Sequence, residues 1–128
     1  MLAGAYLHGF ADGIGAEAKF HGVMCAAMDA SGVIWVTDYT NRALRMLVPL
    51  DPQKYGPYEV VTVCVGPFAT PRGIAIDNHR SKIYLTCYRR HTIVCFKKLF
   101  ERRLVDDVRT HQSTISKYNF FICPYNRK

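Results

Sequence analysis

The residues of this 128-residue chain best suited to chemistry are arginines that occur together with aromatic side chains. A guanidinium group binds phosphate or carboxylate, and a flat ring stacks on a nucleic-acid base. The set that could bind RNA or a protein partner is Arg72, Arg89, Arg90, Tyr39, Tyr88 and His91. No catalytic constellation stands out in the sequence, so we expect no catalytic residue, no metal and no cofactor.

Basic charge is concentrated in the second half of the chain. Residues 1–64 carry four basic and six acidic side chains, net −2, whereas residues 65–128 carry thirteen and four, net +9. A basic half suits nucleic acid, an anionic membrane or an acidic partner. We expect the basic side chains on both rims of the fold, which weakens the case for one nucleic-acid groove. The first rim would carry Arg72, Arg89 and Arg90, and the second Arg80, Lys82, Lys97 and Lys98.

An internal repeat must position these candidates. Residues 32–45 return about 49 residues later as residues 82–94. Upstream, residues 20–29 align with residues 68–77 at an offset of 48, and one extra residue in the turn 78–82 accounts for the change. Each copy holds short β-prone runs separated by polar turns. Repeats of roughly 40–50 residues with several short strands are typical of β-propeller blades.

The two copies resemble NHL repeats. The motifs that carry the resemblance lie at residues 12–20, 34–45 and 68–77. The Asn-His pair that names the family is split, because the first copy keeps Asn41 and the second keeps His91. The second copy departs from the first by placing Cys87 at the position of Asp38 and Arg90 at the position of Asn41. The resemblance implies four-stranded blades of a β-propeller.

We therefore expect an all-β fold with two four-stranded antiparallel blades of an incomplete β-propeller. The NHL-like partial propeller would span residues 1–108, with blade one at about 20–65 and blade two at about 68–108. An irregular or short helical C-terminal tail, residues 109–128, would lie outside the repeat. Two blades are fewer than the three or so that a repeat fold needs, which favours a fragment, a truncated product or one partner in an oligomer.

The repeat also predicts individual strands and one packing residue. Trp35 would pack between blades, with Tyr84 as its counterpart in the second copy. The strands are expected near residues 25–29, 34–38, 44–48, 60–65, 74–77, 83–87, 92–96 and 104–108. The stretch 118–123 is strand-prone and uncharged, so it would be an aggregation hazard if it were exposed.

Cysteine usage indicates a reducing compartment. The five cysteines include no Cys-x-x-Cys pair, and four lie in expected strands, where free cysteine behaves as a small hydrophobe. We therefore expect an intracellular, cytoplasmic protein without a membrane span. Three glycines, Gly9, Gly13 and Gly15, lack the Lys-Ser/Thr of a phosphate-binding loop and are interpreted as a connection between blades.

The resemblance implies a non-catalytic protein-interaction scaffold. An uncovered apolar blade face would bind a protein partner or a second copy of the chain. The first alternative is an RNA-binding NHL propeller that uses the basic rim. The second is a propeller hydrolase or lyase with a metal in the channel, held by Asp38, Asn41 and His91, although two blades supply too few ligands.

Overall fold

The chain folds into two stacked antiparallel β-sheets in this computed structural model, which describes residues 1–54, 56–66, 68–98 and 120–123. Sheet one has the strand order β1-β5-β4-β3-β2. Its strands are β1 (Gly13–Ile14), β2 (Val23–Met28), β3 (Ile34–Asp38), β4 (Ala43–Pro49) and β5 (Tyr58–Val65). Sheet two has the order β6-β7-β8-β9. Its strands are β6 (Pro71–Asp77), β7 (Lys82–Cys87), β8 (Thr92–Lys98) and β9 (Phe120–Cys123).

The all-β prediction is confirmed, and seven of the eight expected strands are present. β3 has the predicted bounds, and the other six differ by a few residues at their ends. Sheet one has five strands and not the predicted four, because β1 pairs with the outer side of β5. The expected strand at 104–108 lies outside the described residues. The prediction of an irregular or helical tail is wrong for Phe120–Cys123, which pairs with β8 as the edge strand of sheet two. The described residues also form two single-turn 3-10 helices, η1 (Gly15–Glu17) and η2 (Tyr88–Arg90).

The strand register of sheet one is repeated in sheet two. Val23 pairs with Asp38, and at the repeat offset Pro71 pairs with Cys87. One residue further along, both first strands contain a bulge. In each bulge a threonine hydroxyl of the next strand accepts the freed backbone N–H. Thr37 Oγ1 accepts from Cys25 at 3.0 Å, and Thr86 Oγ1 accepts from Gly73 at 2.8 Å.

Left-handed backbone conformations recur at the same offset. Four described residues other than glycine have positive φ, and each has a repeat partner that also has positive φ. The three pairs are Gly22 and Thr70, Gly32 and Ser81, and Arg42 and His91. Side chains with a Cβ are strained in this region, so sheet two tolerates strain at positions where sheet one has glycine. The same turns are therefore built twice from different residues.

The two sheets stack head to tail. We define the front face of sheet one by Trp35, Leu44, Met46 and Val48, and its back face by Val36, Leu47 and Val60. At the repeat offset, Tyr84, Ile93, Cys95 and Lys97 form the front face of sheet two, and Ile83, Leu85, Val94 and Phe96 form its back face. The front face of sheet one packs against the back face of sheet two and forms the main core. Each sheet thus uses a different face for this contact.

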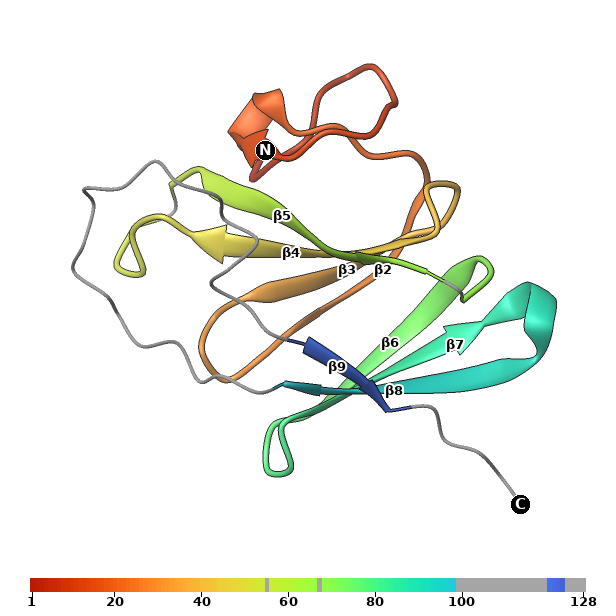
Figure 1. The fold of residues 1–128 in the computed structure, drawn as a ribbon. Helices are drawn as coiled ribbons and strands as arrows, with labels where there is room; N and C mark the ends of the chain where they lie inside the picture. The colour runs from red at the N-terminus through yellow and green to blue at the C-terminus, as the bar shows by residue number, and fades with distance from the viewer. Residues whose placement is uncertain (55, 67, 99–119, 124–128) are drawn as a thin grey trace.

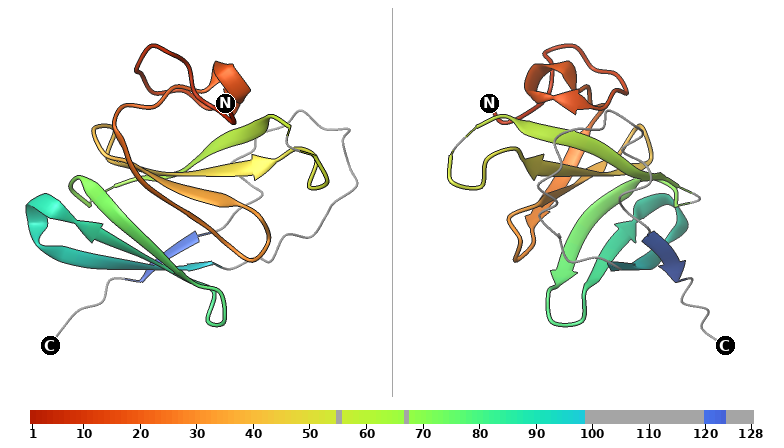
Figure 2. Two further views of the ribbon diagram at one scale, coloured as in Figure 1. Left: turned by 180° about the vertical axis from the view of Figure 1, so that it is seen from behind. Right: turned by 60° about the vertical axis from the view of Figure 1, so that its left-hand side comes forward.

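The back face of sheet one is covered by the N-terminal segment, residues 1–20. This segment lies over sheet one on the side away from sheet two (Figures 1 and 2). Ala18, fully buried, and Phe20 pack against Val36, Leu47 and Val60 in a second core. The segment also adds β1 to the edge of sheet one, where Gly13 pairs with Val60. The N-terminal segment therefore covers the back face of sheet one, just as sheet one covers the back face of sheet two.

Trp35 is buried, as predicted. Only 1% of its surface is exposed, and its indole N–H donates to Asp29 Oδ2 at 2.9 Å. Its counterpart Tyr84 lies on the front face of sheet two and is half-buried. On the same face Ile93 is 66% exposed, whereas its counterpart Leu44 is fully buried. The front face of sheet two thus exposes apolar surface that sheet one buries.

Candidate functional site

The six candidate residues lie at one end of the two sheets. We call this group the rim cluster: Tyr39, Arg72, Tyr88, Arg89, Arg90 and His91. Its backbone is built twice by the repeat, since Tyr39 N donates to Gly22 O at 2.9 Å and Tyr88 N donates to Thr70 O at 3.2 Å. Arg72 is the extra residue of the β6 bulge. A bulge re-aims its extra side chain, and here it directs Arg72 toward the tyrosines.

The centre of the rim cluster is a cation between two rings. The Arg72 guanidinium carbon lies 4.5 Å from the centre of the Tyr88 ring and 6.0 Å from the centre of the Tyr39 ring. Because the two tyrosines are repeat equivalents, each sheet contributes one ring to the same arginine. A cation–π contact at an exposed site contributes about 0.5–1 kcal/mol. The stack therefore positions Arg72 and joins the two sheets at this end.

An open hollow of about 300 Å³ adjoins this stack. Arg72, Tyr88 and His91 line it together with Thr86 and Ile93. His91 is held in the left-handed region with φ of 50°, at the end of η2. The hollow therefore combines a cation, an imidazole and a hydroxyl with the apolar side chain of Ile93. Such a surface suits a ligand that carries both negative charge and apolar or aromatic groups.

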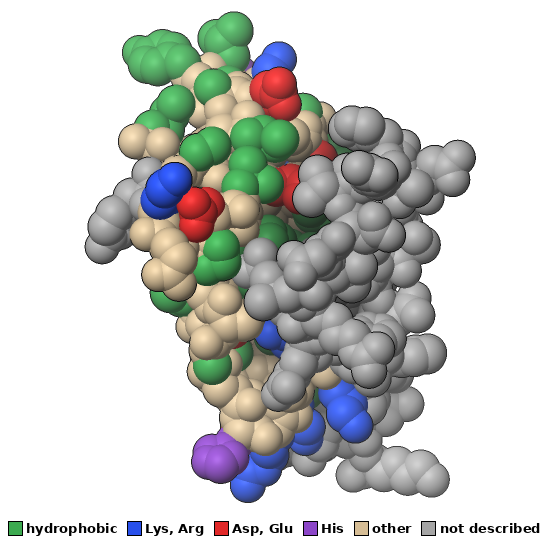
Figure 3. All heavy atoms as spheres, turned by 90° about the vertical axis from the view of Figure 1, so that its left-hand side faces the viewer, with side chains coloured by type: hydrophobic (Ala, Val, Ile, Leu, Met, Phe, Trp, Pro, Cys, Tyr) green, Lys and Arg blue, Asp and Glu red, His purple; other side chains and the backbone are tan. Residues whose placement is uncertain are grey.

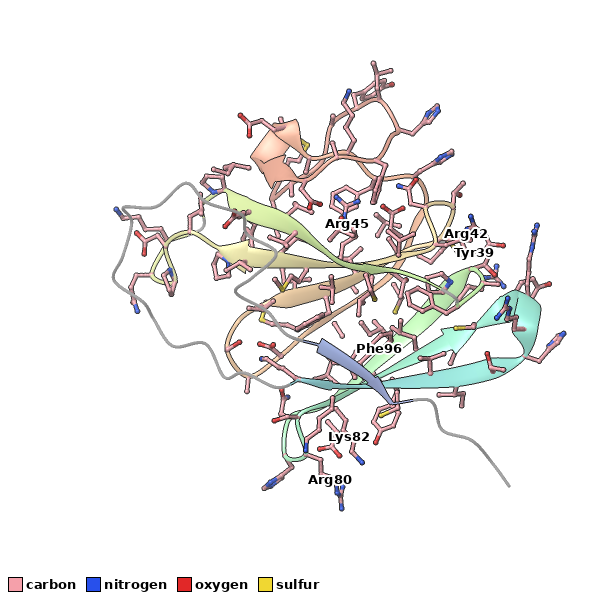
Figure 4. All side chains as sticks on the ribbon, viewed as in Figure 1. Tyr39, Arg42, Arg45, Arg80, Lys82 and Phe96 are labelled. Carbon is pink, nitrogen blue, oxygen red and sulfur yellow. The ribbon has the colours of Figure 1, made fainter. Side chains whose placement is uncertain are left out.

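Arg89 and Arg90 extend the positive charge of the rim cluster. Both lie in η2 and are exposed, and the Arg89 backbone N–H donates to Thr70 Oγ1 at 3.3 Å. The sequence interpretation omitted Arg42, which follows Tyr39 in the first copy of the same turn. Arg42 N donates to Tyr39 O at 3.2 Å, and Figure 4 shows both residues at this end of the sheets. The repeat offset from His91 to Arg42 was the signal that could have identified it.

Basic residues also lie at the opposite end, around the turn between β6 and β7 (Figure 3). Arg80 pairs with Asp77 at 3.1 Å, and Lys98 pairs with the buried Asp29 at 2.6 Å. Burial alone would raise the pKa of Asp29, but hydrogen bonds from Lys98, Ser31 and Trp35 and the charge of Lys98 bring that pKa below its ordinary value. These cations therefore balance acidic side chains of the fold.

Two of the three residues of the channel-metal alternative, Asp38 and Asn41, are hydrogen-bonded to each other. Asp38 is buried and accepts hydrogen bonds from the His21 backbone N–H, Asn41 Nδ2 and Arg45. The Asn41 amide also donates to Gly9 O at 2.8 Å. His91 belongs to the rim cluster on sheet two. Within the described part of the chain, no group of three or more His, Cys, Asp or Glu side chains is placed to hold a metal ion.

Asp38 instead belongs to a buried network centred on Arg45. The Arg45 guanidinium is fully buried and lies 2.9 Å from Asp38 Oδ2 and 2.9 Å from Asp12 Oδ1. It also donates to Ala11 O at 2.7 Å and to Lys19 O at 3.2 Å. The network ties the N-terminal segment to sheet one. Arg45 was not a sequence candidate, although it ends the stretch 34–45 that resembles an NHL repeat.

The glycine-containing segment lies in the N-terminal part of the chain that packs on sheet one. Gly13 lies in β1, and the Glu17 carboxylate accepts a hydrogen bond from the Ile14 backbone N–H at 3.1 Å. A carboxylate at this position would repel a phosphate group. No helix among the described residues has the length and apolar character needed to cross a membrane.

No protein-family model matches the chain, and no curated protein matches it.

Proposed function

We propose that the two sheets are consecutive blades of an NHL-like β-propeller and that the chain is a non-catalytic protein-interaction scaffold. The observation that carries this proposal is the head-to-tail stacking with a repeated register. Two sheets related by a two-fold axis would pack equivalent faces against each other. Here the front face of one copy packs on the back face of the next, which is the relation between successive units of a repeat array.

Head-to-tail stacking leaves one face of the array available for binding. The front face of sheet two carries Tyr84, Ile93 and Cys95 at positions whose counterparts Trp35, Leu44 and Met46 are buried in sheet one. Exposed apolar surface of this kind is typical of protein-binding sites. Aromatic residues such as Tyr84 are enriched in the buried centres of protein interfaces. The partner we propose is a protein or a second copy of this chain.

Sedimentation velocity of the purified chain at micromolar concentration tests this surface. We expect the wild-type chain to sediment as an oligomer and the Ile93→Glu variant to shift toward the monomer, because the charge would be buried at the contact. Leu50→Glu is the matched control, since Leu50 is 48% exposed and lies after β4, away from the front face of sheet two. A monomeric wild-type chain, or equal behaviour of the two variants, would contradict self-association through this face.

RNA binding is a second candidate because of the Tyr39–Arg72–Tyr88 stack. Arginines supply phosphate contacts and rings supply stacking for unpaired bases, at about 1–3 kcal/mol per stacked base. Anisotropy of a labelled single-stranded RNA tests this function. We expect the double variant Arg89→Glu, Arg90→Glu to bind at least about tenfold more weakly than wild type and to show a smaller salt dependence.

The control for the RNA experiment is charge reversal at the opposite end of the sheets. The double variant Arg80→Glu, Lys82→Glu makes the same change in net charge away from the rim cluster. If both double variants lose the same affinity, binding reflects net charge alone and the rim cluster is not an RNA site. If the wild-type chain does not bind the RNA, the second candidate is rejected.

A further inference from the structure

The edge of sheet two places two cysteines directly opposite each other. In the antiparallel pair of β8 and β9, Cys95 is the register partner of Cys123. Directly opposed residues of antiparallel strands lie on the same face with Cβ atoms about 4.5–5.5 Å apart. A disulfide joins Cβ atoms about 3.5–4.5 Å apart, so directly opposed positions of two antiparallel strands are positions that a disulfide can join.

The other described cysteines are not opposed in this way. Cys25 is the register partner of Thr37, and Cys64 is the partner of Leu44. Cys87 faces Pro71 on one side and Thr92 on the other. The Cys95 thiol is free in the structure. The register therefore selects one pairing from the cysteines of the chain.

We propose that Cys95 and Cys123 form a redox-sensitive pair that closes into a cross-strand disulfide between β8 and β9. The oxidant is a small disulfide of the glutathione type. The Cys95 thiolate attacks one sulfur of the oxidant, which forms a mixed disulfide and releases one glutathione thiolate. The Cys123 thiolate then attacks the Cys95 sulfur and displaces the second. Two electrons pass to the oxidant, and the two cysteine protons pass to the two glutathione thiolates.

Two of the other thiols, those of Cys64 and Cys87, are poor competitors for the oxidant. The thiolate is the reactive form of cysteine. Burial raises the pKa of the Cys64 thiol to about 12. Burial also raises the pKa of Cys87, against the smaller effects of Thr92 and Arg90. Both thiols therefore stay protonated at neutral pH and compete poorly for the oxidant.

Closure of the disulfide would fix β9 at the edge of sheet two. β9 is a short strand without charged residues, and its described pairing is with β8 alone. Cys95 lies on the front face of sheet two, so the bond would form beside Tyr84 and Ile93. If that face binds a protein, as proposed above, oxidation would change the edge of the binding surface. The disulfide between Cys95 and Cys123 depends only on the register of β8 and β9, and it does not depend on which partner the chain binds.

Disulfide mapping of the full chain tests the pairing. The reduced protein is equilibrated with glutathione and glutathione disulfide, alkylated and analysed by intact mass and peptide mapping. We expect a product lighter by two hydrogen atoms and a linked peptide that contains Cys95 and Cys123. The ratio of disulfide to dithiol should be at least about tenfold higher in native buffer than in denaturant, because the native register brings the two cysteines together.

A shift of the cysteine by one position provides the sharpest control. The double variant Ile122→Cys, Cys123→Ser places the thiol opposite Phe96, on the other face of the sheet. We expect this variant and Cys95→Ser to accumulate glutathione adducts without the internal link, and Cys25→Ser to behave as wild type. Links among other cysteines, an unchanged link in the register variant, or separate adducts on Cys95 and Cys123 in the wild-type chain would each overturn the proposal. None of these results depends on sedimentation behaviour or RNA affinity.

Discussion

Sheets one and two have the same backbone register but different polar residues next to their back faces. Sheet one has Asp38, Asn41 and Arg45, which form a buried network of ion pairs and hydrogen bonds. At the repeat offset, sheet two has Cys87, Arg90 and Val94. Cys87 and Val94 pack in the apolar core, and Arg90 is exposed. The backbone of the repeat therefore does not require the network.

The difference follows from what covers each back face. The N-terminal segment is irregular and presents three backbone carbonyls, those of Gly9, Ala11 and Lys19, to donors on Asn41 and Arg45. The back face of sheet two meets another β-sheet, whose backbone groups are already paired within the sheet. Buried backbone groups need hydrogen-bond partners, so an irregular cover requires polar side chains beneath it and a sheet does not.

The largest effect should come from truncating Trp35. Trp35→Ala removes a buried ring and the hydrogen bond to Asp29, and we expect the free energy of unfolding to fall by about 3–5 kcal/mol. Tyr84→Ala is the matched change in sheet two, and we expect a loss of about 1 kcal/mol because this front face is uncovered. Chemical denaturation measures both. Equal losses would mean that the front face of sheet two is covered in solution.

The buried network gives the next largest effect. Arg45→Met leaves the Asp38 carboxylate buried without its cation, and we expect a loss of about 3 kcal/mol in the free energy of unfolding. Arg42→Met, an exposed arginine on the same chain segment, should change it by less than about 0.5 kcal/mol. Urea denaturation of both variants is the measurement. A small effect of Arg45→Met would show that the N-terminal segment is not held by this network.

The repeat made most of the fold predictable. β3 was predicted with its observed bounds because a run of residues with strong β preference, residues 33–36, lies between two polar turns. The single-residue change of offset agrees with the register, because Met28 pairs with Ile34 in sheet one and Ile76 pairs with Ile83 in sheet two, with one more residue between the partners. The equivalence of Tyr39 and Tyr88 also follows from the repeat. Local pattern and internal comparison are sufficient where a feature depends on nearby residues.

Features that depend on distant segments were not predictable in the same way. Arg45 contacts Asp12, which lies 33 residues earlier, and no local pattern marks that pairing. β9 was identified as strand-prone, but its place beside β8 depends on a long-range choice of edge. Arg72 reaches the tyrosines because of a bulge whose position the hydrophobic pattern does not show. In each case the sequence does not show which of two distant segments will pair or pack together.

A third effect compares the repeat-equivalent carboxylates Asp29 and Asp77. Asp29 joins the two sheets through Lys98, whereas Asp77 is bonded to Arg80 within its own turn. Lys98→Met should lower the free energy of unfolding by about 1 kcal/mol at neutral pH, because Asp29 keeps four other donor groups, from Ser31, Val33 and Trp35. Arg80→Met, at an exposed pair, should cost less.

The pH dependence gives this third prediction its sign. The pKa of Asp29 in the folded chain lies below its ordinary value. The ionised carboxylate therefore contributes fully to the free energy of unfolding at any pH above the pKa that Asp29 has in the unfolded chain. This contribution is lost as the pH falls through the pKa of the folded chain. The difference between wild type and Lys98→Met should therefore be constant near neutral pH and shrink in acid. A difference that persists at low pH would mean that Lys98 contributes by packing its alkyl chain and not by its charge.

The smallest expected effect comes from exchanging the residues at one repeated turn. Gly32 and Ser81 are repeat equivalents with φ of 82° and 52°, a region in which a Cβ is strained. A Cβ added at Gly32 meets no atom within 4 Å, so Gly32→Ser tests backbone strain without a steric clash. We expect Gly32→Ser to lower the free energy of unfolding by about 0.5–1 kcal/mol and Ser81→Gly to raise it by a similar or smaller amount, since glycine also increases the entropy of the unfolded chain. Thermal and urea unfolding of the two single variants and of the double exchange measure these shifts. If Ser81→Gly destabilises the chain, the serine side chain contributes more than its left-handed backbone costs, and the two turns are then equivalent in geometry but not in energy.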